Sequence, residues 1–232
     1  WDKGLEFMPT LLQNILFHNR QLCERFNIGF HLLCDSNITD YLDVGSEFWG
    51  LRSNHKSDYL RWYLLKDFGG AWIDTDMVLL KDLNILYGRM TSRGYDLGLN
   101  TELTMTEEER NNQGEPRELL NSCDFDNFDS EDPCVKLGCC VLLAKKSSDV
   151  MKDAAAMLKY KLSNSSVPLN EIAWPELGPI LCAELFQKHS RLIQVFDRGL
   201  EDPKGCNAVT WKVDKSDGVH KKNTPGWNKR QW

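Results

Sequence analysis

Apolar residues recur along the first 80 positions at two spacings, one typical of helices and one typical of strands. The helical spacing predicts helices at residues 9–26 and 57–68. Short apolar runs of strand length occupy residues 30–34, 71–73 and 77–80. Helices and strands are therefore expected to alternate in this part of the chain.

Local signals mark the ends of the second of these helices. Ser57 is a residue type that commonly caps a helix N-terminus, and Gly69-Gly70 can end the helix and turn the chain. The apolar run at 71–73 then leads straight into Asp74-Thr75-Asp76. Residues 57–76 therefore predict a helix, a glycine turn, a buried strand and two carboxylates, in that order.

The second half of the chain continues the alternation. Apolar runs predict strands at residues 135–144 and 193–196, and helical spacing predicts helices at 150–162 and 179–189. This order of elements predicts an α/β domain with a mainly parallel central sheet flanked by helices. The tail, residues 205–232, is rich in Gly, Lys, Asn and Trp and is expected to be irregular.

An acidic stretch separates the two halves. Residues 101–133 have no clear period and carry 11 acidic and 2 basic side chains, a net charge of −9. A segment of this length and polarity predicts a long loop. The length of 232 residues predicts one domain, made of a first half at 1–99, the acidic loop at 100–133 and a second half at 134–232.

Composition and charge exclude several classes of protein. Hydrophobic residues make up 41% of the chain and charged residues 27%, which excludes a wholly disordered chain. The net charge of −6 argues against general binding to nucleic acid or to an anionic membrane. No apolar run reaches the roughly 18 residues that a membrane span requires.

The eight cysteines show no CxxC spacing, so a zinc site is not expected. Cys123 and Cys134 flank the acidic loop and could pair in an oxidising compartment. Five others lie in apolar runs and are expected to be buried free thiols: Cys23, Cys34, Cys139, Cys140 and Cys182.

The candidate chemistry lies in residues 57–76. Asp74 and Asp76 follow a strand at its carboxyl end, which is where open α/β sheets bind ligands, and two carboxylates suit a hard divalent cation. Asp58 and Arg61 are three residues apart and share one face of the preceding helix. They form either a surface ion pair of small energy or a pair that grips sugar hydroxyls and an anionic oxygen.

The string S-D-x-x-R, apolar helix, G-G, short strand and D-x-D resembles the DXD-containing glycosyltransferases of the GT-A fold. The likeness is strongest to glycosyltransferase family 32, which includes α-1,4-galactosyltransferases and yeast-type mannosyltransferases, and the clostridial glucosylating toxins share the same core. Glu176-Leu177-Gly178-Pro179 and the tail segments Gly218-Val219-His220 and Trp227-Asn228-Lys229 are also similar to motifs of that family. The resemblance implies a Rossmann-like, nucleotide-sugar-binding GT-A fold.

The resemblance also implies roles for particular residues. Asp76 would be the main metal ligand, assisted by Asp74 and completed by His220 from the tail, with Mn²⁺ or Mg²⁺ as the metal. Asp58 and Arg61 would be catalytic and would hold the donor sugar, and Asp74 would also contact the donor. The family likeness gives Glu176 a catalytic place and adds three nucleotide-sugar contacts: Trp1, Lys221 and Trp227.

The implied activity is metal-dependent transfer of a hexose or related sugar, with retention of configuration. The donor would be a nucleotide diphosphate sugar, UDP-linked in preference to GDP-linked, and the acceptor a glycan or another hydroxyl compound. The acidic balance and the expected free thiols favour the cytoplasm, whereas an anchor removed from before Trp1 would indicate the Golgi lumen.

Two alternatives remain open from the residues. Asp74-Thr75-Asp76-Met77-Val78 also fits the D-x-D-x-[TV] motif of phosphohydrolases of the haloacid-dehalogenase type. A second acidic pair that this chemistry needs is matched poorly by Glu131-Asp132. The other alternative is a glycan-binding relative without catalytic activity.

Overall fold

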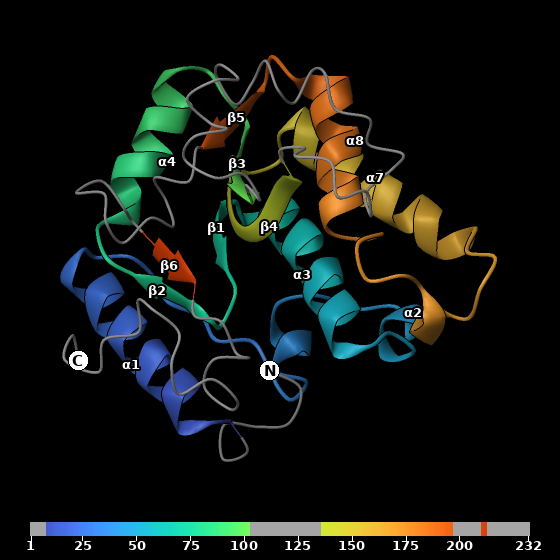
Figure 1. The fold of residues 1–232 in the computed structure, drawn as a ribbon, viewed down its shortest axis with the longest axis horizontal. Helices are drawn as coiled ribbons and strands as arrows, with labels where there is room; N and C mark the ends of the chain where they lie inside the picture. The colour runs from blue at the N-terminus through green and yellow to red at the C-terminus, as the bar shows by residue number, and fades with distance from the viewer. Residues whose placement is uncertain (1–7, 103–135, 197–209, 213–232) are drawn as a thin grey trace, which may run out of the picture.

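The computed structural model describes residues 8–102, 136–196 and 210–212. The described helices and strands follow one another along the chain with two single turns of 3-10 helix (Figure 1). The α-helices are α1 (Thr10–Arg25), α2 (Ser46–Trp49), α3 (Ser53–Phe68), α4 (Leu83–Ser92), α7 (Asp149–Ser163) and α8 (Pro179–His189). The strands are β1 (Gly70–Ile73), β2 (Met77–Leu79), β3 (Leu97–Glu102), β4 (Lys136–Ala144), β5 (Ile193–Phe196) and β6 (Thr210–Lys212). The 3-10 turns are η2 (Ile38–Asp40) and η3 (Leu169–Glu171).

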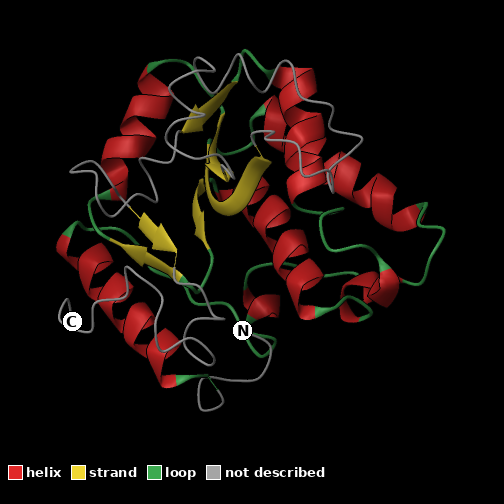
Figure 2. Cartoon of the chain, in the orientation of Figure 1, coloured by secondary structure: helices red, strands yellow, loops and turns green. Residues whose placement is uncertain are grey.

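The fold is α/β, with a mixed sheet of four strands in the order β1-β4-β3-β5 and helices around it (Figure 2). β4 is antiparallel to both of its neighbours, β1 and β3, and β5 alone runs parallel to β3. The expectation of a mainly parallel sheet is therefore wrong for the described strands. The alternation of helices and strands implied that a helix connects each strand to a parallel neighbour. β3 and β4 are instead consecutive described strands on either side of the acidic stretch, and they pair antiparallel.

Two hydrophobic clusters cover the two faces of this sheet. On one face, Leu97, Leu99 and Leu142 pack with the buried sides of α3, α7 and α8. On the other face, Leu143 and Phe196 pack against α4. Figure 1 shows α4 on one side of the strands and α3, α7 and α8 on the other. Successive residues of β4 thus face opposite cores, as a strand covered on both faces requires.

Several sequence predictions are confirmed within one or two residues. These are α1, β1, β2, β4, α7, α8 and β5. The prediction for α3 is wrong at its start, because the helix begins at Ser53 and follows Arg52, whose backbone is extended. α4 and β3 were not predicted from the sequence, since β3 contains Gly98 and Asn100 and is not a continuous apolar run.

Residues 30–34 do not form the predicted strand. The side chain of Asn37 accepts a hydrogen bond from Cys34 N at 2.9 Å and donates one to Leu32 O at 2.9 Å. Backbone groups that a sheet would have paired are thus bonded to a local turn. In the tail, residues 210–212 form β6 and pair with β2, so irregular structure was the wrong prediction for these three residues.

The glycine turn joins α3 to β1 as predicted. Gly69 has φ of 69°, and a Cβ atom there would lie 2.7 Å from Lys146 N, so a larger residue would both strain the backbone and collide with the chain. β1 can therefore pair with β4 beside the end of α3. None of the described helices is long and apolar enough to span a membrane.

Candidate functional site

A cleft of about 740 Å³ opens between α3, the segment 31–41 and the end of β1. The side chains of the turn Asp74-Thr75-Asp76 line it, as do three residues from the second half of the chain, Cys139, Trp174 and Pro179. Asp58 and Arg61 from α3 also line this cleft. The structure therefore brings together the four residues that the sequence singled out, Asp58, Arg61, Asp74 and Asp76.

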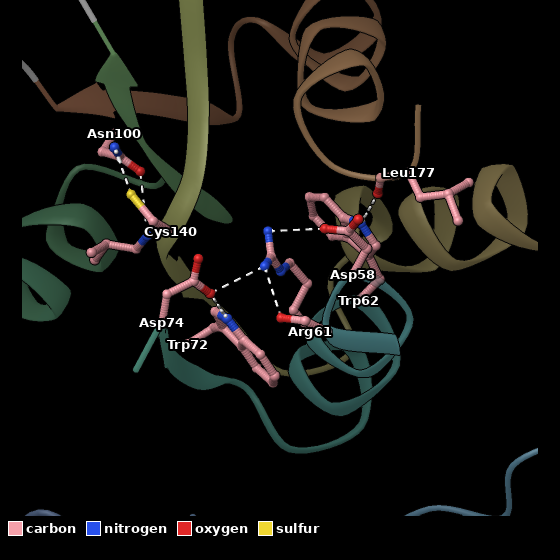
Figure 3. Close-up of polar contacts among 10 residues, drawn as sticks. Asp58, Arg61, Trp62, Trp72, Asp74, Asn100, Cys140 and Leu177 are labelled. Carbon is pink, nitrogen blue, oxygen red and sulfur yellow. Dashed lines mark hydrogen bonds and ion pairs between the residues drawn. The ribbon is translucent and has the colours of Figure 1, made fainter. Parts of the chain in front are cut away.

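Arg61 lies at the centre of this group and only 3% of it is exposed. Its Nη1 lies 3.2 Å from Asp58 Oδ1, and its Nη2 donates to Asp74 Oδ1 at 3.1 Å and to Ser57 Oγ at 3.1 Å. Figure 3 shows the guanidinium between the two carboxylates. Because Asp58 and Arg61 are both buried, the alternative of a solvent-exposed ion pair is excluded. The buried guanidinium is instead compensated by two carboxylates.

Asp74 is held by neighbours on β1 and β4. Trp72 Nε1 donates to Asp74 Oδ1 at 2.8 Å, and Asp74 N donates to Cys140 O at 2.9 Å (Figure 3). The Trp72 ring also lies under the guanidinium, with Arg61 Cζ 5.5 Å from the ring centroid. Although Oδ1 carries these bonds, the Asp74 side chain remains 30% exposed to the cleft. It is therefore oriented and still accessible to a ligand.

Asp76 is positioned through the strand that follows it. Met77 N donates to Asp74 O at 3.0 Å, which closes the turn that carries both aspartates. From α1, Asn19 Nδ2 donates to Met77 O at 2.8 Å and its Oδ1 accepts from Leu79 N at 2.8 Å. Asn19 is 2% exposed, so its amide acts as an internal strand partner for β2. The only sign of this residue in the sequence is an Asn on the apolar side of the helix predicted at residues 9–26.

The carboxylate of Asp58 is set against the start of α8. A Cβ atom built on Gly178 would lie 2.8 Å from Asp58 Oδ1 and 3.0 Å from Cys139 Sγ. The glycine of the Gly178-Pro179 pair therefore lets the backbone approach the charged group closely. Trp62 Nε1 donates to Leu177 O at 2.9 Å and fixes the same segment to α3.

A bulge brings Cys139 into the cleft. The register between β3 and β4 shifts after Leu99, so that Asn100 pairs with Gly138. The Asn100 side chain bonds into the resulting gap, donating to Cys140 Sγ at 3.3 Å and accepting from Val141 N at 3.3 Å. Bulges commonly redirect a side chain next to a site, and here the redirected residue is a thiol beside the charged group.

Burial has a direct electrostatic consequence for Asp58. Desolvation raises the pKa of its carboxyl from 3.8 to about 6, against the opposing effect of Arg61, and the charge of Asp74 raises it further. Near pH 7 Asp58 is thus ionised, but less firmly than an exposed carboxylate would be.

The raised pKa of Asp58 predicts that the protein gains stability from this group on acidification. Because the folded protein holds the Asp58 proton more tightly than the unfolded chain does, protonation of Asp58 stabilises the folded state. This stabilisation is complete below pH 3.8, the ordinary pKa, and is lost as the pH rises through about 6, the pKa in the folded protein. At about 1.4 kcal/mol per pKa unit the effect amounts to roughly 3 kcal/mol. Urea unfolding in chelator at pH 7.5 and pH 4 should therefore show wild type gaining stability relative to Asp58→Asn. Asp43→Asn, at an exposed position, is the control, and a difference between wild type and Asp58→Asn that does not change with pH would contradict the prediction.

Among the described residues, one predicted site residue, Glu176, does not lie at the cleft. Glu176 pairs with Lys161 through Oε2 and Nζ at 3.2 Å, and Lys161 also binds Glu184 at 2.8 Å. Glu176 does not line the cleft, so the geometry gives no support to a catalytic role for it. Four further predicted residues lie outside the described residues: Trp1, His220, Lys221 and Trp227.

The five cysteines expected to be free are free, although Cys34 and Cys139 are only half-buried. Cys123 and Cys134 lie outside the described residues. Within the described part of the chain, no three His, Cys, Asp or Glu side chains are grouped closely enough to hold a metal ion. Asp74 and Asp76 would therefore need further donors to complete a metal site.

Comparison with known proteins gives a match to a family model over the first part of the chain. The model of a family described as capsular polysaccharide synthesis protein matches residues 1–108, which include Asp58, Arg61, Asp74 and Asp76. Neither the curated proteins nor the solved structures contain a match. The first 108 residues are thus similar to capsular polysaccharide synthesis proteins, which suggests a glycosyltransferase-like family.

Proposed function

We propose that this protein is a metal-dependent glycosyltransferase that uses a nucleotide diphosphate sugar as donor and a glycan as acceptor. The observation that carries the proposal is the buried Asp58–Arg61 pair, which contacts Asp74 and shares the cleft with Asp76. The family match supports glycan synthesis in general. The finer assignment, to a DXD enzyme like those of glycosyltransferase family 32, rests on the resemblance of residues 57–76.

The charges of the group favour a divalent cation. Three carboxylates, Asp58, Asp74 and Asp76, and one guanidinium, Arg61, line the cleft, so these four side chains carry a formal charge of −2. This charge would repel a diphosphate that arrived alone. Mg²⁺ is commonly bound through one or two carboxylates together with substrate phosphates, and a set formed by Asp74 and Asp76 fits that pattern. When bound, Mn²⁺ or Mg²⁺ would neutralise the leaving diphosphate.

The side chains of the protein would position the donor. Arg61 is fixed by two carboxylates before any ligand arrives, and such preorganised charge needs no rearrangement during the reaction. Asp58, ionised near neutral pH, can accept hydrogen bonds from sugar hydroxyls. Trp72 holds Asp74 in place. We further propose that transfer retains configuration, that UDP-sugars are the preferred donors, and that Trp1, His220, Lys221 and Trp227 complete the site.

The contacts of Asp74 argue against the phosphohydrolase alternative. In that chemistry the first aspartate of the motif is the nucleophile. Here Asp74 Oδ1 accepts from both Arg61 and Trp72, and these bonds withdraw negative charge from the carboxylate that would have to attack phosphorus. The geometry is that of a positioned binding group.

A donor screen tests the proposal. The full chain is incubated with UDP-Glc, UDP-Gal, UDP-GlcNAc, UDP-Xyl, GDP-Man and GDP-Fuc, and release of UDP or GDP is measured with Mn²⁺, with Mg²⁺ and in chelator. We expect release from at least one donor that stops in chelator. No release from any donor, together with metal-dependent hydrolysis of p-nitrophenyl phosphate, would replace the transferase by the phosphohydrolase.

A further inference from the structure

The cleft follows α3 over nearly its whole length. Its lining begins at Ser53 and reaches Phe68, a distance of about 22 Å at 1.5 Å per residue. Asp58 and Arg61 lie between these ends, and Arg61 pairs with both Asp58 and Asp74, which follows β1. A reaction centre in the middle of a cleft leaves room for a ligand group at either end.

The two ends of the cleft differ in chemistry. At the C-terminal end of α3 the lining is apolar, from Leu64, Leu65 and Phe68. At the N-terminal end, hydroxyl and amide groups from Ser53 and Asn54 line the wall. The N-terminal end can therefore exchange several hydrogen bonds with a polar ligand.

The two charged side chains that line the N-terminal end of the cleft, Lys56 and Asp35, neutralise each other. Lys56 Nζ lies 2.7 Å from Asp35 Oδ2, and both residues line the cleft. The Lys56 ammonium also lies 5.1 Å from the ring centroid of Trp49, and this cation–π contact makes it less available to a ligand. Among the described residues that line the cleft, this end therefore carries no net side-chain charge, whereas the centre carries −2, and it suits a neutral polar ligand.

Trp174 forms the wall of this end. It lines the cleft, yet 59% of it is exposed, an unusual combination for so large an apolar side chain. The segment that carries it is tied to α3 on both sides, because Arg52 Nη2 donates to Ile172 O and Trp62 Nε1 donates to Leu177 O. The backbone that carries the indole is thus anchored before any ligand binds, which lowers the entropy cost of binding.

A sugar ring matches these features. It presents an apolar C–H face that can pack on an aromatic ring, and hydroxyl groups at its edge that need hydrogen-bond partners. We propose that Trp174 and the N-terminal turn of α3, with Ser53 and Asn54, form a subsite for a neutral sugar residue of the acceptor glycan. That the bound glycan is the acceptor of a transfer reaction rests on the proposed function, whereas glycan binding at Trp174 does not.

Glycan binding can be measured without any transfer reaction. The full chain is titrated with neutral hexasaccharides of glucose, galactose and mannose, in α- and β-linked forms, and binding is followed by calorimetry. We expect at least one to bind, and Trp174→Ala to weaken that binding about tenfold or more, as the loss of a central aromatic contact does. Trp174→Phe should restore part of the affinity. Tyr160→Ala, which removes an exposed aromatic residue of α7 that does not line the cleft, should bind as wild type does.

Two kinds of result would overturn the proposed sugar subsite. The first is that Trp174 makes no difference to glycan binding, either because no hexasaccharide binds or because wild type and Trp174→Ala bind equally. The other is a loss of UDP-sugar affinity in Trp174→Ala as large as the loss of glycan affinity, which would assign Trp174 to the nucleotide. Glycan binding through Trp174 in a protein that releases no nucleotide from any donor would keep the subsite and remove the transferase function.

Discussion

Asp76→Asn is expected to lower the turnover of the sugar-nucleotide donor at least about a hundredfold, equivalent to about 2.7 kcal/mol of transition-state stabilisation. Asparagine keeps the size of the side chain but removes the charge that would meet a cation at the diphosphate. Asp76 is 8% exposed and lies at the wall of the cleft, so the neutral amide should be accommodated without unfolding. Donor turnover as a function of Mn²⁺ concentration is the measurement.

The control for this variant is Asp43→Asn, which removes one negative charge at an exposed position away from the cleft. It should retain wild-type turnover and wild-type Mn²⁺ dependence. Equal urea midpoints for wild type and the two variants would show that the loss in Asp76→Asn is local to the site. Full turnover by Asp76→Asn in chelator would exclude a metal-assisted mechanism through this residue.

The string from Ser57 to Asp76 predicted which residues lie together at the centre of the candidate site. Asp58 and Arg61 share a helix face at i,i+3 spacing, and Gly69-Gly70 returns the chain so that Asp74 meets Arg61 at 3.1 Å. All these contacts are local in sequence, and local periodicity and turn chemistry are what a single sequence reports well. The same reasoning correctly predicted α1, β1 and β2 in the first half, but it missed α2, α4 and β3.

Contacts between distant segments could not be predicted. Asn19 reaches β2 across 58 residues, and Gly178 meets Asp58 across a still longer separation. The antiparallel placement of β4 between β1 and β3 likewise depends on pairing that no local pattern encodes. The resemblance implied a catalytic role for Glu176, which the geometry does not support because Glu176 pairs with Lys161 and does not line the cleft. This pairing depends on how α7 packs, so the sequence could not show it.

Arg61→Lys is expected to lower kcat/KM for the donor about a hundredfold while leaving the protein folded. The guanidinium reaches Asp58 with one nitrogen and both Asp74 and Ser57 with the other. A lysine ammonium is a single compact charge and cannot reproduce this planar fork. It still supplies a positive charge, so Asp58 does not become a buried carboxylate without a counter-ion.

Arg61→Met separates the role of the charge from the role of the fork. Methionine leaves both carboxylates without their cation, and loss of one partner of a buried pair typically costs about 3–5 kcal/mol. Urea unfolding should therefore show a large loss of stability for Arg61→Met and a much smaller one for Arg61→Lys. Arg89→Lys, on the exposed side of α4, should match wild type in both stability and kinetics. If Arg61→Lys keeps the wild-type kcat/KM with every donor that wild type uses, Arg61 serves the fold alone, and the donor must be held by other residues of the cleft.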